Sequence, residues 1–217
     1  MTRSGRLLAL ALGASLIALL APGQEGPQVM RFRRNWDKAK ALTLQQSIRD
    51  SKDLSDLERS RLLDAVASQL RPSKSDRGIK SEKELRDAAS RYRLEMVDLS
   101  VDGKERGFVV GGIGEYDCSP TGNCSVWVLR TGTHGYPVVL HGIAQSVWIW
   151  PTRTTGFQDI VLGMHGSATS TTLKLYKFDG SRYRRMACYI ADFEYLDQDG
   201  TIHELEEPRI TPCGQRR

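Results

Sequence analysis

The chain has 217 residues, of which 40% are hydrophobic and 26% charged, and its formal net charge is +5. This length is sufficient for one good-sized hydrophobic core, or for one core with a small helical appendage. Basic residues are dense at residues 31–34, whereas a nucleic-acid-binding protein normally presents a larger basic face. We therefore expect no nucleic-acid partner.

Residues 1–23 have the organisation of a secretory signal peptide. Arg3 and Arg6 precede an apolar run at 7–21, and small residues follow it. The run is short for a membrane span, so a retained anchor is the less favoured alternative. Cleavage is expected after Gly23, which leaves 29 basic residues against 26 acids. We expect a secreted or periplasmic protein with no membrane span after signal cleavage, because no later segment is long and apolar enough.

The N-terminal third is expected to be helical. Residues 24–34 lack periodicity and are interpreted as a flexible leader, and the helical segment is placed at 35–92. Apolar residues near helical spacing between 35 and 50 indicate its first helix.

Two capping boxes define clearer helices within this segment. Ser55 and Glu58 open a helix with one apolar stripe, which ends at Pro72. Ser81 and Glu84 open a shorter helix. The apolar stripe is expected to dock on the same protein, with a partner protein as the alternative, because an isolated helix of this length is marginal.

Residues 93–213 are predicted to form an antiparallel all-β domain. Short apolar runs are bounded by Gly, Pro or Thr, and Asp-Gly turns occur at 102–103, 179–180 and 199–200. The run at 171–178 alternates apolar and polar residues, as a half-buried strand does. The predicted fold class is α+β, with a β domain that is a sandwich, barrel-like or a partial propeller.

The four cysteines indicate disulfide bonds in an exported chain. Cys118 and Cys124 bracket Ser-Pro-Thr-Gly-Asn, a turn composition that brings chain ends together. Cys188 and Cys213 would then connect the last strands to the C-terminal tail. A metal site would require close pairs such as C-x-x-C, and the sequence has none.

A calcium-binding loop is a weaker candidate. Asp98, Ser100 and Asp102 match the first half of a loop whose alternate oxygens bind a hard cation. Val109 occupies the position of the required bidentate acid, so an ordinary hairpin turn is the simpler interpretation. No metal or other cofactor is predicted.

His165 is the most suggestive of the four histidines because Ser167 follows closely. The sequence Gly-Met-His-Gly-Ser-Ala-Thr is not the G-x-S-x-G turn of a serine hydrolase. A polar hairpin tip is therefore the alternative to a catalytic base.

Trp148 and Trp150 have strand spacing and should share one face of a sheet. An exposed pair of indoles would form a contact surface for a glycan or a protein. The alternative is that both side chains belong to the core.

Residues 98–105, followed by Phe108-Val109-Val110, resemble the opening of FG-GAP/VCBS-type β modules. The segments CSPTGNCSVWVLR and DIVLGMHGSATSTTLKLYKFDGSRYR are similar to small exported bacterial proteins of unknown function. The resemblance covers about residues 94–190, and the chain is too short for a full propeller of such modules. It implies a secreted β module used for binding and assigns no catalytic residue.

These observations predict an exported, non-enzymatic module that binds an envelope or extracellular protein or a glycan. Trp148, Trp150 and His165 are its candidate binding residues. The alternatives are a small secreted hydrolase centred on His165 and a calcium-stabilised structural domain.

Overall fold

The computed structural model describes residues 26–214 except 101–102, 104, 168 and 198, so the predicted signal peptide lies outside the described residues. The helices in the described part are α1 (Pro27–Trp36), α2 (Asp56–Leu70) and α3 (Glu82–Ser90), with a short 3-10 turn at Arg71–Ser73. None of these helices has the length and apolar character needed to cross a membrane.

The strands form two sheets in which all paired neighbours are antiparallel. The first sheet contains, in spatial order, β1 (Lys40–Ala41), β7 (Ser146–Thr154), β8 (Phe157–His165), β9 (Ser170–Phe178), β10 (Tyr183–Leu196) and β11 (Ile202–Pro212). The second contains β2 (Gln46–Ser47), β3 (Arg93–Asp98), β4 (Arg106–Gly111), β5 (Cys124–Arg130) and β6 (Val138–Ala144).

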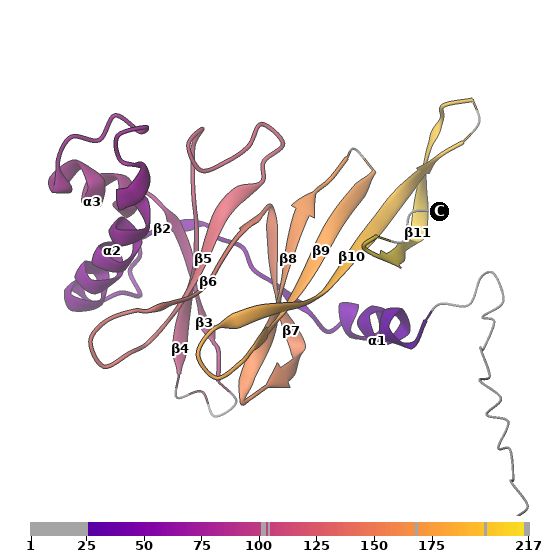
Figure 1. Ribbon diagram of the computed structural model, residues 1–217, viewed down its shortest axis with the longest axis horizontal. Helices are drawn as coiled ribbons and strands as arrows, with labels where there is room; N and C mark the ends of the chain where they lie inside the picture. The colour runs from indigo at the N-terminus through magenta and orange to yellow at the C-terminus, as the bar shows by residue number, and fades with distance from the viewer. Residues whose placement is uncertain (1–25, 101–102, 104, 168, 198, 215–217) are drawn as a thin grey trace, which may run out of the picture.

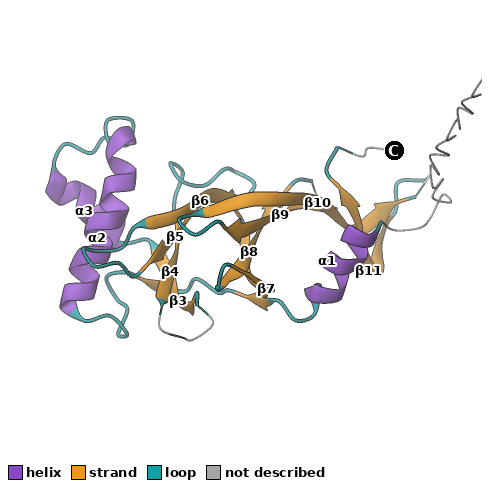
Figure 2. Cartoon of the chain, turned by 60° about the horizontal axis from the view of Figure 1, so that its bottom comes forward, coloured by secondary structure: helices purple, strands orange, loops and turns teal. Residues whose placement is uncertain are grey.

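The two sheets face each other, and helices cover their outer faces (Figure 1, Figure 2). The core between the sheets is built from strand residues of both, including Val109 and Val128 of the second sheet and Ile160 and Leu162 of the first. Alternate positions of each strand point into this core, which explains the period of two in the sequence. The predicted α+β class with an antiparallel β domain is confirmed.

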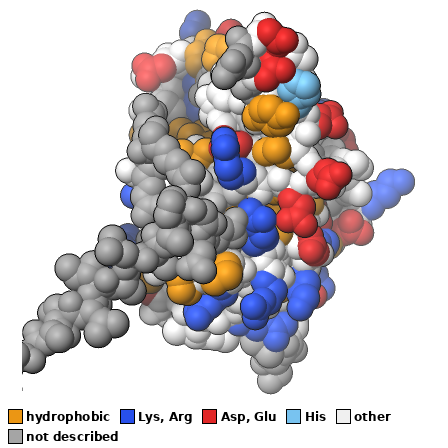
Figure 3. All heavy atoms as spheres, turned by 90° about the vertical axis from the view of Figure 1, so that its right-hand side faces the viewer, with side chains coloured by type: hydrophobic (Ala, Val, Ile, Leu, Met, Phe, Trp, Pro, Cys, Tyr) orange, Lys and Arg blue, Asp and Glu red, His pale blue; other side chains and the backbone are white. Residues whose placement is uncertain are grey.

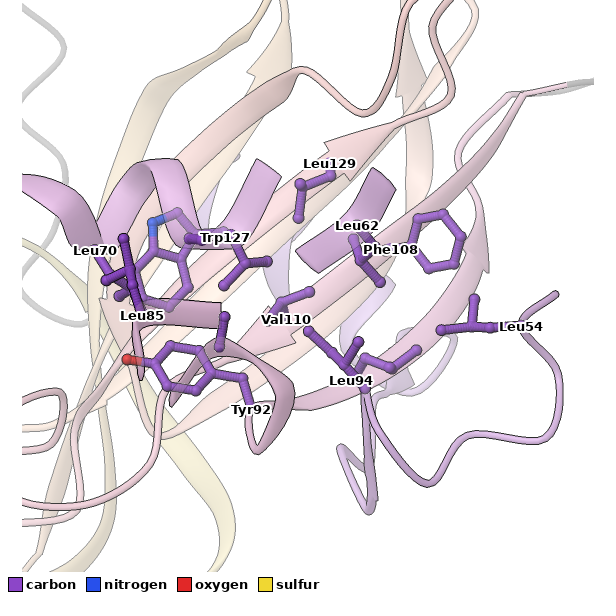
Figure 4. Close-up of a cluster of buried hydrophobic side chains, with 14 residues drawn as sticks. Leu54, Leu62, Leu70, Leu85, Tyr92, Leu94, Phe108, Val110, Trp127 and Leu129 are labelled. Atoms are coloured by element: carbon purple, nitrogen blue, oxygen red, sulfur yellow. The ribbon is translucent and has the colours of Figure 1, made fainter. Parts of the chain in front are cut away.

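Helices α2 and α3 cover the outer face of the second sheet. At the start of α2, the Ser55 hydroxyl accepts a hydrogen bond from the Glu58 amide at 3.3 Å, and the Glu58 carboxylate accepts one from the Ser55 amide at 2.9 Å, so the predicted capping box is formed. The apolar stripe of α2 docks on the protein's own sheet. Figure 4 shows the buried side chains that fill this interface, among them Leu62, Leu70, Leu85, Leu94, Phe108, Val110 and Trp127.

Helix α1 replaces most of the predicted flexible leader, so that interpretation of 24–34 was wrong from Pro27 onward. Pro27 occupies the first turn, where its missing N–H has no helical partner to lose. Val29 and Phe32 are buried against the outer face of the first sheet, and Trp36 packs beside them. The segment was interpreted as a flexible leader because it lacks clear periodicity, but its arginines at 31, 33 and 34 lie beside an apolar stripe whose members are about one helical turn apart.

The predicted helix between 35 and 50 was also wrong beyond Trp36. This segment runs in extended form past all three buried clusters: Ala39 packs outside the first sheet, Leu42 and Leu44 pack between the sheets, and Ile48 lies under the helices. The spacing of its apolar residues therefore follows the distances between these buried clusters rather than the period of a helix. Packing overrides local propensity here.

Both predicted disulfide bonds are present, Cys118–Cys124 and Cys188–Cys213. The first closes a loop at the start of β5, and the second joins β10 to the residue that follows β11. Because β10 and β11 are already paired, the second disulfide stabilises the base of the last hairpin.

A buried ion pair connects the helical layer to the first disulfide loop. Both terminal guanidinium nitrogens of Arg77 donate to the Asp117 carboxylate, at 2.8 and 2.6 Å, and the Tyr92 hydroxyl also donates to Asp117. Only 13% of the Arg77 side chain and 2% of the Asp117 side chain are exposed. Tyr92 in turn stacks on Trp127 of β5. The helices are thus fixed to the sheet by polar as well as apolar contacts.

Candidate interaction surface

Trp148 and Trp150 share one face of β7, but they do not form an exposed platform. The Trp150 side chain is 1% exposed and stacks on Phe32 of α1, with ring centroids 4.5 Å apart. Trp148 is half buried and packs beside Trp36 of α1, with ring centroids 5.4 Å apart. With α1 docked, the core interpretation of this pair is the correct one.

His165 ends β8, and its backbone has a structural role. The Asn123 side chain accepts a hydrogen bond from the His165 amide at 2.8 Å and donates one to its carbonyl at 3.0 Å. These bonds connect the first disulfide loop to the opposite sheet. Among the described residues, the His165 ring has no hydrogen bond to a hydroxyl or an acid, the arrangement that a hydrolase centre requires.

The structure describes only part of the predicted calcium-binding loop. Asp102 lies outside the described residues, and Asp98 ends β3 with an exposed side chain. The Ser100 hydroxyl accepts a hydrogen bond from the Glu105 amide at 2.9 Å, as in an ordinary turn. The described residues contain no group of three or more acids, histidines or cysteines arranged to hold a metal ion.

The hairpin formed by β10 and β11 is the most distinctive surface feature. It extends beyond the rest of the sheet (Figure 1). The register shifts between Asp192 and Glu194, so the outer half of the hairpin is offset from the inner half. An irregularity of this kind bends and twists a strand pair. β11 is the last strand of its sheet, so its outer edge has no neighbouring strand among the described elements.

Large apolar side chains of this hairpin are exposed. Phe193 is 38% exposed, Tyr195 44% and Ile202 52%. Figure 3, which views this end of the molecule, shows apolar and acidic side chains together over its upper half and basic side chains along its lower edge. Clusters of exposed apolar groups with a polar rim mark interaction sites more often than scattered ones.

The hairpin is also strongly acidic. Residues 192–208 contain seven acids and no Lys or Arg. Asp192 pairs with Arg209 at 3.3 Å, and Glu207 pairs with Arg33 at 3.2 Å. By contrast, three exposed or half-exposed acids have no ion-pair partner among the described residues: Glu194, Glu204 and Glu206.

Two of these acids are placed directly opposite each other. The register pairs Glu194 of β10 with Glu204 of β11, and Ile202 lies on the same face, two residues from Glu204. Like charges in directly opposite positions destabilise a strand pair. The repulsion between Glu194 and Glu204 therefore lowers the stability of the hairpin.

The other face of the hairpin carries a small polar cluster. Tyr195 lies opposite His203, and their rings stack with centroids 5.0 Å apart. A ring nitrogen of His203 lies 2.7 Å from the Asp197 carboxylate. Hydrogen bonds with Asp199 and His203 lower the pKa of Asp197. These polar contacts connect the ends of the two strands, while Tyr195 on the same face is 44% exposed.

None of these hairpin residues was among the candidate binding residues predicted from the sequence. The available signal was the acidic bias of 192–208, which stands out in a chain of net positive charge. Exposure of the three apolar side chains is a consequence of where the hairpin projects, and the sequence alone contains no sign of it.

The chain was compared with known proteins at three levels. Neither the protein-family models, nor the curated proteins, nor the solved structures contain a match to this chain.

Proposed function

We propose that this protein is an exported, non-enzymatic binding module that presents the β10–β11 hairpin to a cationic partner protein of the cell envelope or the medium. Export is supported by the signal-like residues 1–23 and by two disulfide bonds, which persist in oxidising compartments.

The observation that carries the proposal is the unneutralised pair Glu194–Glu204 beside exposed Ile202. A repulsion that weakens the fold and has no internal counter-ion is typical of a functional site. A basic partner surface on this face would neutralise the acids, and its apolar groups would cover Ile202. Charge complementarity of this type increases the association rate and the specificity.

The test is a capture experiment with the mature chain as bait against the envelope and medium fractions of the producing cell. We expect a basic protein to be retained at low salt and released as the salt concentration rises, because exposed charge contacts are screened. The test variant combines Glu194→Gln, Glu204→Gln and Glu206→Gln. The matched control, Asp53→Asn with Asp76→Asn and Glu115→Gln, removes the same charge from exposed acids without ion-pair partners in the described structure.

Capture alone does not support the proposal. It is supported if the same partner is lost with the hairpin variant and kept by the control. Equal loss in both variants would indicate a general charge effect and contradict it. Retention only of further copies of this chain, seen as dimers by light scattering, would replace the cationic partner with self-association.

A further inference from the structure

A second surface lies on the inner face of the first sheet, where β9 and β10 run close to β6 of the second sheet (Figure 1, Figure 2). Along β9, Lys174 and Tyr176 alternate with residues that are buried on the outer face, so both side chains belong to the inner face. The register places Arg185 of β10 directly opposite Tyr176. The three side chains therefore share one face of two neighbouring strands.

The strand β6 borders this surface. A side chain at Gly142 of β6 would come within 2.6 Å of Leu162 and 3.8 Å of the Tyr176 hydroxyl oxygen, so glycine allows β6 to lie close to the first sheet here. Lys174 and Tyr176 are half buried, and Arg185 is exposed. A ligand can therefore reach all three side chains from solvent.

The three side chains offer hydrogen-bond donors that have no acceptor oxygen among the described residues. The Lys174 amine donates to the sulfur of Met164 at 2.9 Å, and a thioether is a weak acceptor. The Tyr176 hydroxyl, which solvent can reach, has no hydrogen-bond partner in the described part of the chain, and neither has the Arg185 guanidinium. The surface thus presents donors without the acceptors that would satisfy them.

Lys174 and Arg185 also lack a counter-charge among the described residues. The two other cations of β9 and β10, Lys177 and Arg184, each have an acid partner. Strands β6 and β9 contain no acid, and β10 contains none before Asp192. Burial lowers the pKa of Lys174, and so does the positive charge of Arg185. Two neighbouring cations therefore repel each other on a face without an acid.

These donors and charges indicate the chemistry of the ligand. A carboxylate carries one negative charge, whereas a phosphate monoester carries about −1.5 to −2 near neutral pH and so compensates both cations. Guanidinium and ammonium groups each form charge-assisted hydrogen bonds with phosphate oxygens. The Tyr176 hydroxyl can donate to a further oxygen of the same group. Met186, which follows Arg185 and is 64% exposed, offers an apolar contact to the organic part of the ester.

We infer that Lys174, Tyr176 and Arg185 bind a phosphate monoester group, carried by a small molecule or by a lipid headgroup. The inference is independent of the proposed partner of the β10–β11 hairpin. It concerns the other end of β10, and the ligand has the opposite charge.

The test uses the full mature chain, labelled with ¹⁵N, and phenyl phosphate as the monoester probe. Diphenyl phosphate and benzoate, which carry a single negative charge, are compared at equal ionic strength. We expect phenyl phosphate to shift the amide signals of Lys174, Tyr176 and Arg185, while those of the hairpin tip stay in place. Its affinity should exceed that of either singly charged probe about ten-fold or more, because only a dianion compensates both cations.

Vesicles of phosphatidylcholine with and without phosphatidic acid distinguish the two sources of the phosphate group. Binding of phenyl phosphate assigns a free monoester, and binding only to the vesicles that contain phosphatidic acid assigns a lipid headgroup. Equal affinity for the three small anions would overturn the inference. The absence of binding both to phenyl phosphate and to these vesicles would overturn it as well.

Variants then locate the contact. Lys174→Gln and Arg185→Gln should each weaken binding of the accepted monoester about ten-fold or more, because each removes a hydrogen bond to a charged group. The matched controls Lys52→Gln and Arg61→Gln change exposed cations on the helical side that have no ion-pair partner among the described residues, and they should leave the affinity unchanged. Thermal melting of every variant verifies folding. Unchanged affinity in both test variants, or an equal loss in the controls, would contradict the inference.

Discussion

At the scale of single residues, the ion pair between Arg77 and Asp117 is the most important polar contact of the fold. Burial opposes the charged state of Arg77, yet its hydrogen bonds to Asp117 raise the pKa of the guanidinium further above its ordinary value. The pair is almost inaccessible to water. Removing one partner therefore leaves an uncompensated buried charge.

We predict that Asp117→Ala lowers the free energy of unfolding by about 3 to 5 kcal/mol. The measurement is urea denaturation at neutral pH. Arg77→Met combined with Asp117→Ala should recover part of this loss, because no charge then remains buried without a partner. A double variant that is as unstable as the sum of the two single variants would contradict this account of the pair.

Two buried tyrosines make the fold sensitive to alkaline pH. Burial raises the pKa of Tyr92, as does its hydrogen bond to Asp117, and burial also raises the pKa of Tyr183. In the unfolded chain a tyrosine loses its proton near pH 10, at about the ordinary pKa, while the folded protein keeps it. The unfolded state then binds fewer protons, so stability is full below about pH 10 and falls as the pH rises further.

We predict that Tyr183→Phe makes this fall less steep, by up to about 1.4 kcal/mol per pH unit. The measurement is the free energy of unfolding from about pH 9 to 11, compared with that of the unsubstituted protein. Tyr116→Phe is the control, because the Tyr116 side chain is 56% exposed. Parallel pH profiles for all three proteins would contradict the proposed linkage.

At the scale of elements, α1 is the least expected part of the fold. It is a short helix whose stability comes from the aromatic contacts of Phe32 with Trp150 and Tyr189, at 4.5 and 4.3 Å between ring centroids. An isolated helix of ten residues is not stable in water. The helix and the burial of the tryptophans therefore depend on each other.

We predict that Phe32→Ala weakens the docking of α1 by about 3 kcal/mol or more, the cost of removing a buried aromatic ring. Tryptophan fluorescence should shift to the red, and quenching by acrylamide should increase, as Trp148 and Trp150 become exposed. Met30→Ala changes a residue of the same helix that is 49% exposed, and it should leave both signals unchanged. An unshifted spectrum for Phe32→Ala would show that α1 does not protect these rings.

The elements that could be predicted from the sequence are those specified by local chemistry. Ser55 and Glu58 identified α2, the Asp-Gly turns identified hairpins, and the cysteine spacing identified both disulfide bonds. Elements specified by distant contacts could not be predicted. The segment after α1 takes its apolar pattern from three separate cores, and Trp150 is hidden by a helix that exists only because it packs there.

At the scale of the whole molecule, the two disulfides should differ in their contribution to stability. Cys188–Cys213 spans 25 residues and Cys118–Cys124 only six. On the loop-entropy model we predict losses of about 3 to 4 kcal/mol and about 2 kcal/mol, respectively, when each pair is replaced by serines. Urea denaturation of the two variants measures this order, and a larger loss for the short loop would contradict it.

Charge is also divided across the whole molecule. Residues 192–208 hold seven of the 26 acids, so the rest of the chain carries 31 basic and 19 acidic residues. The hairpin is therefore a negative projection on a positive body. Such a distribution directs a cationic partner to the hairpin and away from the remaining surface.

The acidic pair allows binding and stability to be separated. We predict that Glu204→Gln raises the free energy of unfolding by about 0.2 to 1 kcal/mol, since it removes the repulsion with Glu194, while it weakens partner binding. Urea denaturation and the capture experiment on the same preparation measure the two effects. A simultaneous loss of stability and binding would indicate that Glu204 has only a structural role.

The most direct test of the hairpin as the contact surface is photo-crosslinking in the intact producing cell. A photoreactive phenylalanine analogue replaces Ile202, which is 52% exposed, in one strain and Tyr116, which is 56% exposed and lies outside the hairpin, in another. The account predicts a covalent adduct with a basic protein from position 202 alone, which disappears when Glu194, Glu204 and Glu206 are changed to Gln. The same adduct from both positions, or adducts only with acidic proteins, would contradict it.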